Sequence, residues 1–227
     1  MVRTFVAYPE IKPLLDKSTA IAKYFQTKEG QSELLYWTGR SYEPYRDTVT
    51  PVATQWTSYC ESIDSILRVK GATSLWMLSS RGSVTLTADE WLELEAISRI
   101  LTPFTHSVNE LQRTDQPTTS RLWGFHVITT RVLEQLEVPP LIRPAKERLL
   151  ALLHESASEI ANVRQTAACL VDPKMACYAD SIDAGQLAEA KAWLADFVES
   201  TTQVLSCTHH SLGAGECTVG IFTLTHP

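Results

Sequence analysis

TADEWLELEAISRILTPFTHSVNEL, residues 87–111, is the stretch that decides the fold class. Thr87 and Glu90 have the spacing of a capping box, in which two backbone donors at a helix start are satisfied reciprocally. Behind them, apolar residues recur every three or four positions, as on one face of an α-helix: Trp91, Leu94, Ile97, Leu101, Phe104, Val108 and Leu111. Pro103 predicts a kink, because proline lacks one donor and clashes with the preceding turn. The stretch therefore predicts a long amphipathic helix.

The same helical period extends outward in both directions. It predicts further helices over 10–26, 32–37, 52–78, 118–136, 143–163 and 184–205, with a connector over 38–51 and a possible bend at Gly71. We expect the helix over 118–136 to bury Leu122, Phe125, Ile128, Val132 and Leu136, and the one over 184–205 to bury Leu187, Trp193, Leu194, Phe197, Val198 and Val204. The remaining tryptophans at apolar helix positions, Trp56, Trp76 and Trp123, are expected in the core.

These elements predict an all-α, multi-helix bundle in three segments. Residues 1–50 form an N-terminal helical segment and connector, 51–205 the main helical domain, and 206–227 a poorly ordered tail with one possible short strand at 221–224. Breaks are expected at Pro139 and Pro140 and at Asp172 and Pro173. A chain of 227 residues is long enough to bury a core without disulfides or metals.

Composition and charge limit the functional classes. The net charge is -6 and the pI about 5.5, whereas free-standing nucleic-acid binders usually have a basic face and a high pI. The five cysteines are odd in number and widely spaced, which favours free thiols in a reducing compartment. We find neither a signal peptide nor a stretch of membrane-spanning length. The sequence therefore predicts a protein of the nucleus or, alternatively, the cytoplasm.

The sequence shows no strong catalytic motif. It has no phosphate-binding glycine loop, dinucleotide fingerprint or nucleophile elbow, and it predicts no enzyme, no cofactor and no small-molecule substrate. Two weaker patterns are metal-ligand types: Cys207, His209, His210 and Cys217, and the carboxylates Asp172, Asp180 and Asp183. Incidental placement and helix capping are the simpler interpretations of both. A loose positive group, Arg121, Arg131, Arg143, Lys146 and Arg148, is either a phosphate-binding surface or a solvated face.

Several segments together resemble the hAT family of DNA transposases. Residues 11–35, with the helix IKPLLDKSTAIAKYFQT and then Leu34 and Leu35, are similar to the helix that follows the family's second catalytic aspartate. TQWTSY at 54–59 resembles the family's TRWNST segment, and SIDSIL at 62–67 continues it. LTADEW at 86–91, LTPFT at 101–105, PTT at 117–119 and ACLVDPK at 168–174 are similar to later segments in the same order.

The resemblance implies a fold and a context. In such transposases an all-helical insertion interrupts an RNase H-like core, whose three acidic residues bind two metals and cleave DNA. The segments with the first two aspartates would lie before Ile11, so we expect a catalytically incomplete, transposase-derived domain. The insertion supplies a tryptophan that stabilises flipped DNA, and Trp56 is the matching position. An unpaired base stacked on an aromatic ring gains ~1–3 kcal/mol. The usual arginine before it is Gln55 here, which weakens a phosphate contact at that point.

Two main functional hypotheses follow. The first is a non-catalytic domain that retains weak binding to branched or single-stranded DNA, with Trp56, Ser58, Arg121 and Arg131 as candidate DNA-binding residues. The second is a protein-interaction scaffold that binds a protein partner or a second copy of itself, which the acidic charge and the exposed-looking tyrosines Tyr36, Tyr42 and Tyr45 favour. A third hypothesis, a metal-dependent nuclease, would depend on Asp172, Asp180 or Asp183.

Overall fold

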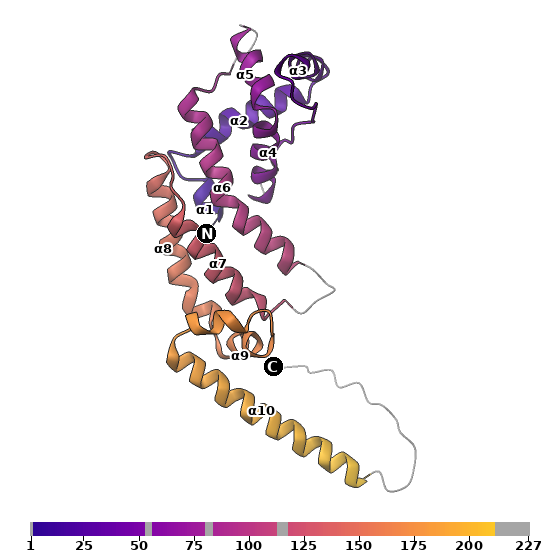
Figure 1. Ribbon diagram of the computed structural model, residues 1–227, viewed down its shortest axis with the longest axis vertical. Coiled ribbons are helices and arrows are strands. Elements are labelled where there is room, and N and C mark those ends of the chain that lie inside the picture. The colour runs from indigo at the N-terminus through magenta and orange to yellow at the C-terminus, as the bar shows by residue number, and fades with distance from the viewer. Residues whose placement is uncertain (1, 53–55, 80–83, 113–117, 212–227) are drawn as a thin grey trace.

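The computed structural model describes residues 2–52, 56–79, 84–112 and 118–211, with the backbone alone for Trp56, Ser158 and 203–211 (Figure 1). Within these residues the chain forms helices and no strand, which confirms the all-α prediction. The elements are α1 (Val2–Val6), α2 (Lys12–Phe25), α3 (Lys28–Ser41), α4 (Trp56–Arg68), α5 (Lys70–Leu78), α6 (Ala88–Leu111), α7 (Arg121–Gln135), α8 (Arg143–Ile160), α9 (Val163–Val171), the 3-10 helix η1 (Ala176–Ser181) and α10 (Ala184–Ser211).

Helix α6 begins as its capping residues predict. Thr87 Oγ1 accepts from the Glu90 N–H at 3.1 Å, and the Glu90 carboxylate accepts from the Thr87 N–H at 2.9 Å. The apolar face predicted for the first half is confirmed, because Trp91, Leu94, Ile97 and Leu101 are buried. The helix continues through Pro103 to Leu111, and the apolar residues of this second half are only partly buried.

Two hydrophobic cores hold the helices together. The larger core takes side chains from α1 to α6, from Leu133 of α7 and from α8, and it includes the fully buried Phe25 and Trp76. It therefore joins residues from both 1–50 and 51–205. The smaller core lies among α7, α9 and η1, around Trp123 and Cys169. In Figure 1, α10 extends away from this second core at the end of the molecule opposite α3 and α5.

Some predicted boundaries shift. The helix expected over 32–37 begins earlier and ends later, as α3, because Thr27 caps its start. The break expected at Gly71 lies at Val69, between α4 and α5. Helix α10 continues to Ser211, so the first six residues of the predicted tail are helical. Residues 212–227, with the possible strand at 221–224, lie outside the described residues.

Two predicted buried faces are wrong in part. On α7, Ile128 and Val132 are exposed, whereas Trp123, His126 and Val127 are buried. The buried face is rotated by about one residue because it also accommodates the polar side chains of His126 and Arg121. On α10, Phe197 and Val198 are exposed, since the helix packs mainly on α9 and runs past it. In the described part of the chain, no helix combines the length and apolar character needed to cross a membrane.

Candidate functional site

The junction of α2 and α3 fixes the position of the candidate site. Thr27 Oγ1 accepts from the Gly30 N–H at 3.0 Å and donates to the carbonyl of Tyr24 at 2.8 Å. Gly30 is buried against the end of α2, and a Cβ on it would lie 2.0 Å from the Tyr24 carbonyl oxygen. Only glycine allows this approach. Helix α3 therefore begins directly against the end of α2, and its side chains lie close to Tyr24.

A hydrogen-bonded carboxylate lies at the centre of this region. Glu33 Oε2 on α3 accepts from the Tyr24 hydroxyl at 2.8 Å and from Trp76 Nε1 at 2.6 Å. The rings of Tyr24 and Trp76 stack with centroids 4.9 Å apart. Burial, together with the neighbouring Glu33 carboxylate, raises the pKa of Tyr24 to about 12. Three helices thus meet at one carboxylate, whose position is set by two directed donors.

Helix α5 is held against α3 by a second carboxylate. Glu43, just after α3, accepts from the N–H groups of Gly71 and Ala72 at 3.0 Å each, at the start of α5. A carboxylate there satisfies two unpaired donors and interacts favourably with the positive end of the helix dipole. At the other end of α5, the Ser79 hydroxyl donates to the carbonyl of Trp76 at 2.6 Å. The start of α5 is therefore held by Glu43, and Ser79, which closes the last turn of α5, lines the same cavity as residues of α3.

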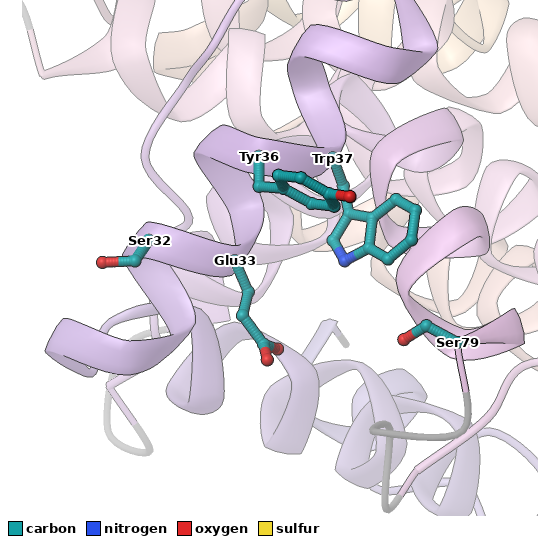
Figure 2. Close-up of a pocket in the computed structure, with 5 residues that line it drawn as sticks. All are labelled: Ser32, Glu33, Tyr36, Trp37 and Ser79. Atoms are coloured by element: carbon teal, nitrogen blue, oxygen red, sulfur yellow. The ribbon is translucent and has the colours of Figure 1, made fainter.

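These contacts create a cavity of about 570 Å³ lined by Ser32, Glu33, Tyr36, Trp37 and Ser79 (Figure 2). In Figure 2, the Tyr36 and Trp37 rings lie side by side above the Glu33 carboxylate, and Ser79 faces them from α5. The two rings meet edge to face with centroids 5.0 Å apart, and Tyr36 is 52% exposed. We call these five residues, together with Arg40, the α3 surface.

Arg40 lies against the same rings. Its guanidinium carbon is 4.4 Å from the Tyr36 ring centroid and 5.6 Å from that of Trp37. Both distances are within the range of a cation–π contact. The α3 surface therefore combines the exposed Tyr36 ring, the half-buried Trp37 ring and the Arg40 guanidinium with a carboxylate and hydroxyl groups.

The four candidate DNA-binding residues lie on α4 and α7 rather than on the α3 surface. Trp56 is the first residue of α4, and its side chain is outside the described structure. Ser58 is buried, and its hydroxyl bonds to both the N–H and the carbonyl of Val52. Arg121 is buried with its guanidinium 3.0 Å from the Glu110 carboxylate. Arg131 is exposed and donates to the Ser181 hydroxyl at 3.3 Å. Of the candidate DNA-binding residues whose side chains the structure describes, Arg131 is therefore the exposed one.

Two of the three candidate metal-binding carboxylates, Asp172 and Asp183, accept local hydrogen bonds, and the third, Asp180, lies within η1. Hydrogen bonds from the Ser120 hydroxyl and from the Lys174 N–H hold the pKa of Asp172 below its usual value. Asp183 accepts from the N–H groups of Gly185 and Gln186 at the start of α10. Among the described residues, no three His, Cys, Asp or Glu side chains are grouped to hold a metal. The side chains of Cys207, His209, His210 and Cys217 lie outside the described residues.

The sequence identified part of the α3 surface and missed the rest. Tyr36, Tyr42 and Tyr45 are 52%, 97% and 40% exposed, which confirms that prediction. Trp76, Trp91 and Trp123 are buried, as expected of core residues. The roles of Glu33, Trp37 and Arg40 were not predicted, although their spacing from Tyr36 places all four on neighbouring positions of one helix.

Comparison of the chain with known protein families, with curated proteins and with solved structures finds no match.

Proposed function

We propose that this protein is a non-enzymatic helical module that binds a protein partner through the α3 surface. The observation that supports it is the exposed Tyr36 ring, beside the half-buried Trp37 ring and the Glu33 carboxylate, in one cavity. Aromatic side chains and arginine are enriched in the centres of protein interfaces. The rings bury a large area with few rotatable bonds, and the guanidinium adds five hydrogen-bond donors and stacks on aromatic faces. Tyr36, Trp37 and Arg40 together have this composition.

The rigidity of the surface adds to the proposal. A binding surface that is already ordered loses little conformational entropy when a partner docks. The Gly30 contact fixes α3, Glu43 fixes α5, and Tyr24 and Trp76 fix Glu33. Partner side chains would therefore meet a pre-formed cavity rather than one that must assemble.

A peptide-display selection with the purified chain tests the proposal. Tyr36→Ala removes the most exposed ring of the cavity, and Phe197→Ala is the matched control, since Phe197 is 55% exposed but lies on α10. We expect the selection to recover peptides that lose binding to Tyr36→Ala and keep it to Phe197→Ala. Recovery of no Tyr36-dependent peptide would contradict the proposal.

DNA binding by a transposase-derived domain is the second candidate function. The resemblance to the hAT family motivates it, and the exposed guanidinium of Arg131 is the observation that favours it. Arg121 is less suited to a phosphate, because such a contact would compete with its ion pair to Glu110. This candidate implies a nuclear protein without strand-cleaving activity.

Gel-shift titrations with branched and single-stranded DNA test the second candidate. Trp56→Ala and Arg131→Gln should each weaken binding, whereas Arg164→Gln, which changes an exposed arginine of α9 outside the candidate positive group, should leave it unchanged. Equal losses in all three variants would indicate unspecific attraction to positive charge. Unchanged binding in Trp56→Ala and Arg131→Gln would remove these residues as contacts.

A further inference from the structure

We infer that the partner of the α3 surface is a second copy of this chain, docked so that the two α3 helices run antiparallel. This inference rests on the protein-binding function proposed above and names its partner. It follows from which side of α3 is exposed and from where the charged residues lie along that side.

Among the described residues, one side of α3 is uncovered. Gly30, Leu34 and Thr38 recur every four positions and are buried, because α3 packs through their side on α2 and α5. The opposite side is apolar at its middle, where Leu35 is 60% and Tyr36 52% exposed. In Figure 1, α3 lies at one end of the molecule, where a second chain has access to it.

The two ends of this exposed side carry opposite charges. Glu29 lies in the first turn of α3 and Arg40 in the last, and both are exposed. Their positions differ by about three helical turns, so they lie on the same edge of the helix. Neither forms an ion pair with another described residue. The Arg40 guanidinium rests on the Tyr36 ring, which has no lone pair for its N–H donors, so these donors remain available to a carboxylate.

An antiparallel, twofold pair brings these charges together. Glu29 and Arg40 are equidistant from the midpoint of α3, which lies between Leu34 and Leu35. A twofold axis at this midpoint places Arg40 against Glu29 of the partner subunit, and Glu29 against the partner's Arg40. The same axis brings Leu35 and Tyr36 of the two copies together at the centre. The pair therefore has an apolar centre between two contacts of opposite charge, as protein interfaces commonly have.

The other charges of α3 are compatible with this pairing. Lys28 lies about 100° around the helix from Glu29, on the other edge of the exposed side, and would face the partner's Tyr42. Glu33 lies on the same edge as Glu29 and opposes no negative group, and the pairing does not require its charge. Each chain has a net charge of -6, but at about 0.15 M salt charges more than ~8 Å apart are largely screened. The contacting pairs therefore decide the orientation.

Sedimentation velocity of the full chain measures the association. Two helices of 14 residues bury less area than a standard stable interface, so we expect a weak, reversible monomer–dimer equilibrium between about 10 µM and about 1 mM. Glu29→Arg and Arg40→Glu each place like charges at both contacts and should weaken the dimer about tenfold. Glu189→Arg, the same reversal at an exposed position of α10, should leave it unchanged. Circular dichroism of each variant confirms that the fold is retained.

The two variants together separate specific pairing from the effect of net charge. Glu29→Arg makes the chain less negative and Arg40→Glu makes it more negative, so a general repulsion between chains would move their affinities in opposite directions. An equimolar mixture of the two variants again joins opposite charges at both contacts and should dimerise about as tightly as the wild type. The double variant, with the two charges exchanged within one chain, should do the same.

A wild-type chain that stays monomeric over this range would overturn the inference, and so would wild-type affinity in both single variants. A mixture of the two variants that stays monomeric would overturn it as well. The proposed function would survive each of these results if the display selection still recovers Tyr36-dependent peptides. If no peptide depends on Tyr36, and Tyr36→Ala dimerises as the wild type does, the proposed function and the α3 pairing fail together.

Discussion

Two glycines of α3 predict opposite effects of the same substitution. In Gly30→Ala the new Cβ would lie 2.0 Å from the Tyr24 carbonyl oxygen and 2.9 Å from the Phe25 Cα. These are backbone atoms, so α3 must move away from α2. Overpacking of this kind costs about 1–3 kcal/mol, and a 2.0 Å contact belongs at or above the upper end. The gain in helix propensity offsets ~1 kcal/mol. We expect a net destabilisation of about 2 kcal/mol, or a fall in Tm of about 4–8 °C.

Gly39→Ala is the matched control on the same helix. Gly39 is exposed, and a Cβ on it would have no atom within 4 Å. Only the propensity gain remains, so we expect a stabilisation of up to ~1 kcal/mol and a rise in Tm of about 2–4 °C. Thermal and urea unfolding followed by circular dichroism measure both. Shifts of the same sign in the two variants would refute the close packing of α3 on α2.

Three further predictions concern the contacts around the α3 surface and the second core. Glu43→Ala leaves the Gly71 and Ala72 N–H groups without their acceptor and should cost about 1–2 kcal/mol in urea unfolding, whereas Glu137→Ala, an exposed carboxylate elsewhere, should change stability little. Burial, reinforced by nearby His154, lowers the pKa of His126, so the unfolded chain takes up this proton first and stability is lost as pH falls below about 6.5. In His126→Phe the decline of Tm between about pH 7 and pH 5 should be shallower; an unchanged slope would exclude His126 as its source. The pKa of Tyr24 is raised to about 12, so this residue's contribution to stability is complete below about pH 10 and is lost as pH rises toward 12. Tyr24→Phe should flatten that alkaline decline, and an equally steep decline in the variant would count against the raised pKa.

The features that the sequence predicts well are local. The Thr87 and Glu90 capping box involves residues three positions apart, and it places the start of α6 correctly. Asp172 and Pro173 likewise mark the end of α9. Helix starts and ends of this kind depend on backbone donors and acceptors within one turn, so the pattern of residues is sufficient to find them.

The features that it misses depend on partners far along the chain. Arg121 is buried on α7 because Glu110, at the end of α6, neutralises it, and a periodicity that counts arginine as polar places this face in solvent. Glu43 belongs to a connector in the sequence, but it caps α5 from 28 residues away. On α10, Phe197 and Val198 follow the apolar period and yet extend beyond the helix that would cover them.

The candidate site likewise has one part that the sequence predicts and another that it does not. The exposure of Tyr36 is predictable from its place near a polar connector. The network of Glu33 is not, because its two donors come from α2 and α5, 9 and 43 residues away. Only the folded arrangement shows that these rings and this carboxylate line one cavity.

Amide hydrogen exchange of the full chain, with and without a Tyr36-dependent peptide at saturating concentration, tests the central claim most directly. Added protection should appear in α3 and at the end of α5 near Ser79, while α7 and α10 exchange as in the unbound protein. Protection centred on α7 near Arg131, with α3 unchanged, would contradict a partner-binding role for the α3 surface.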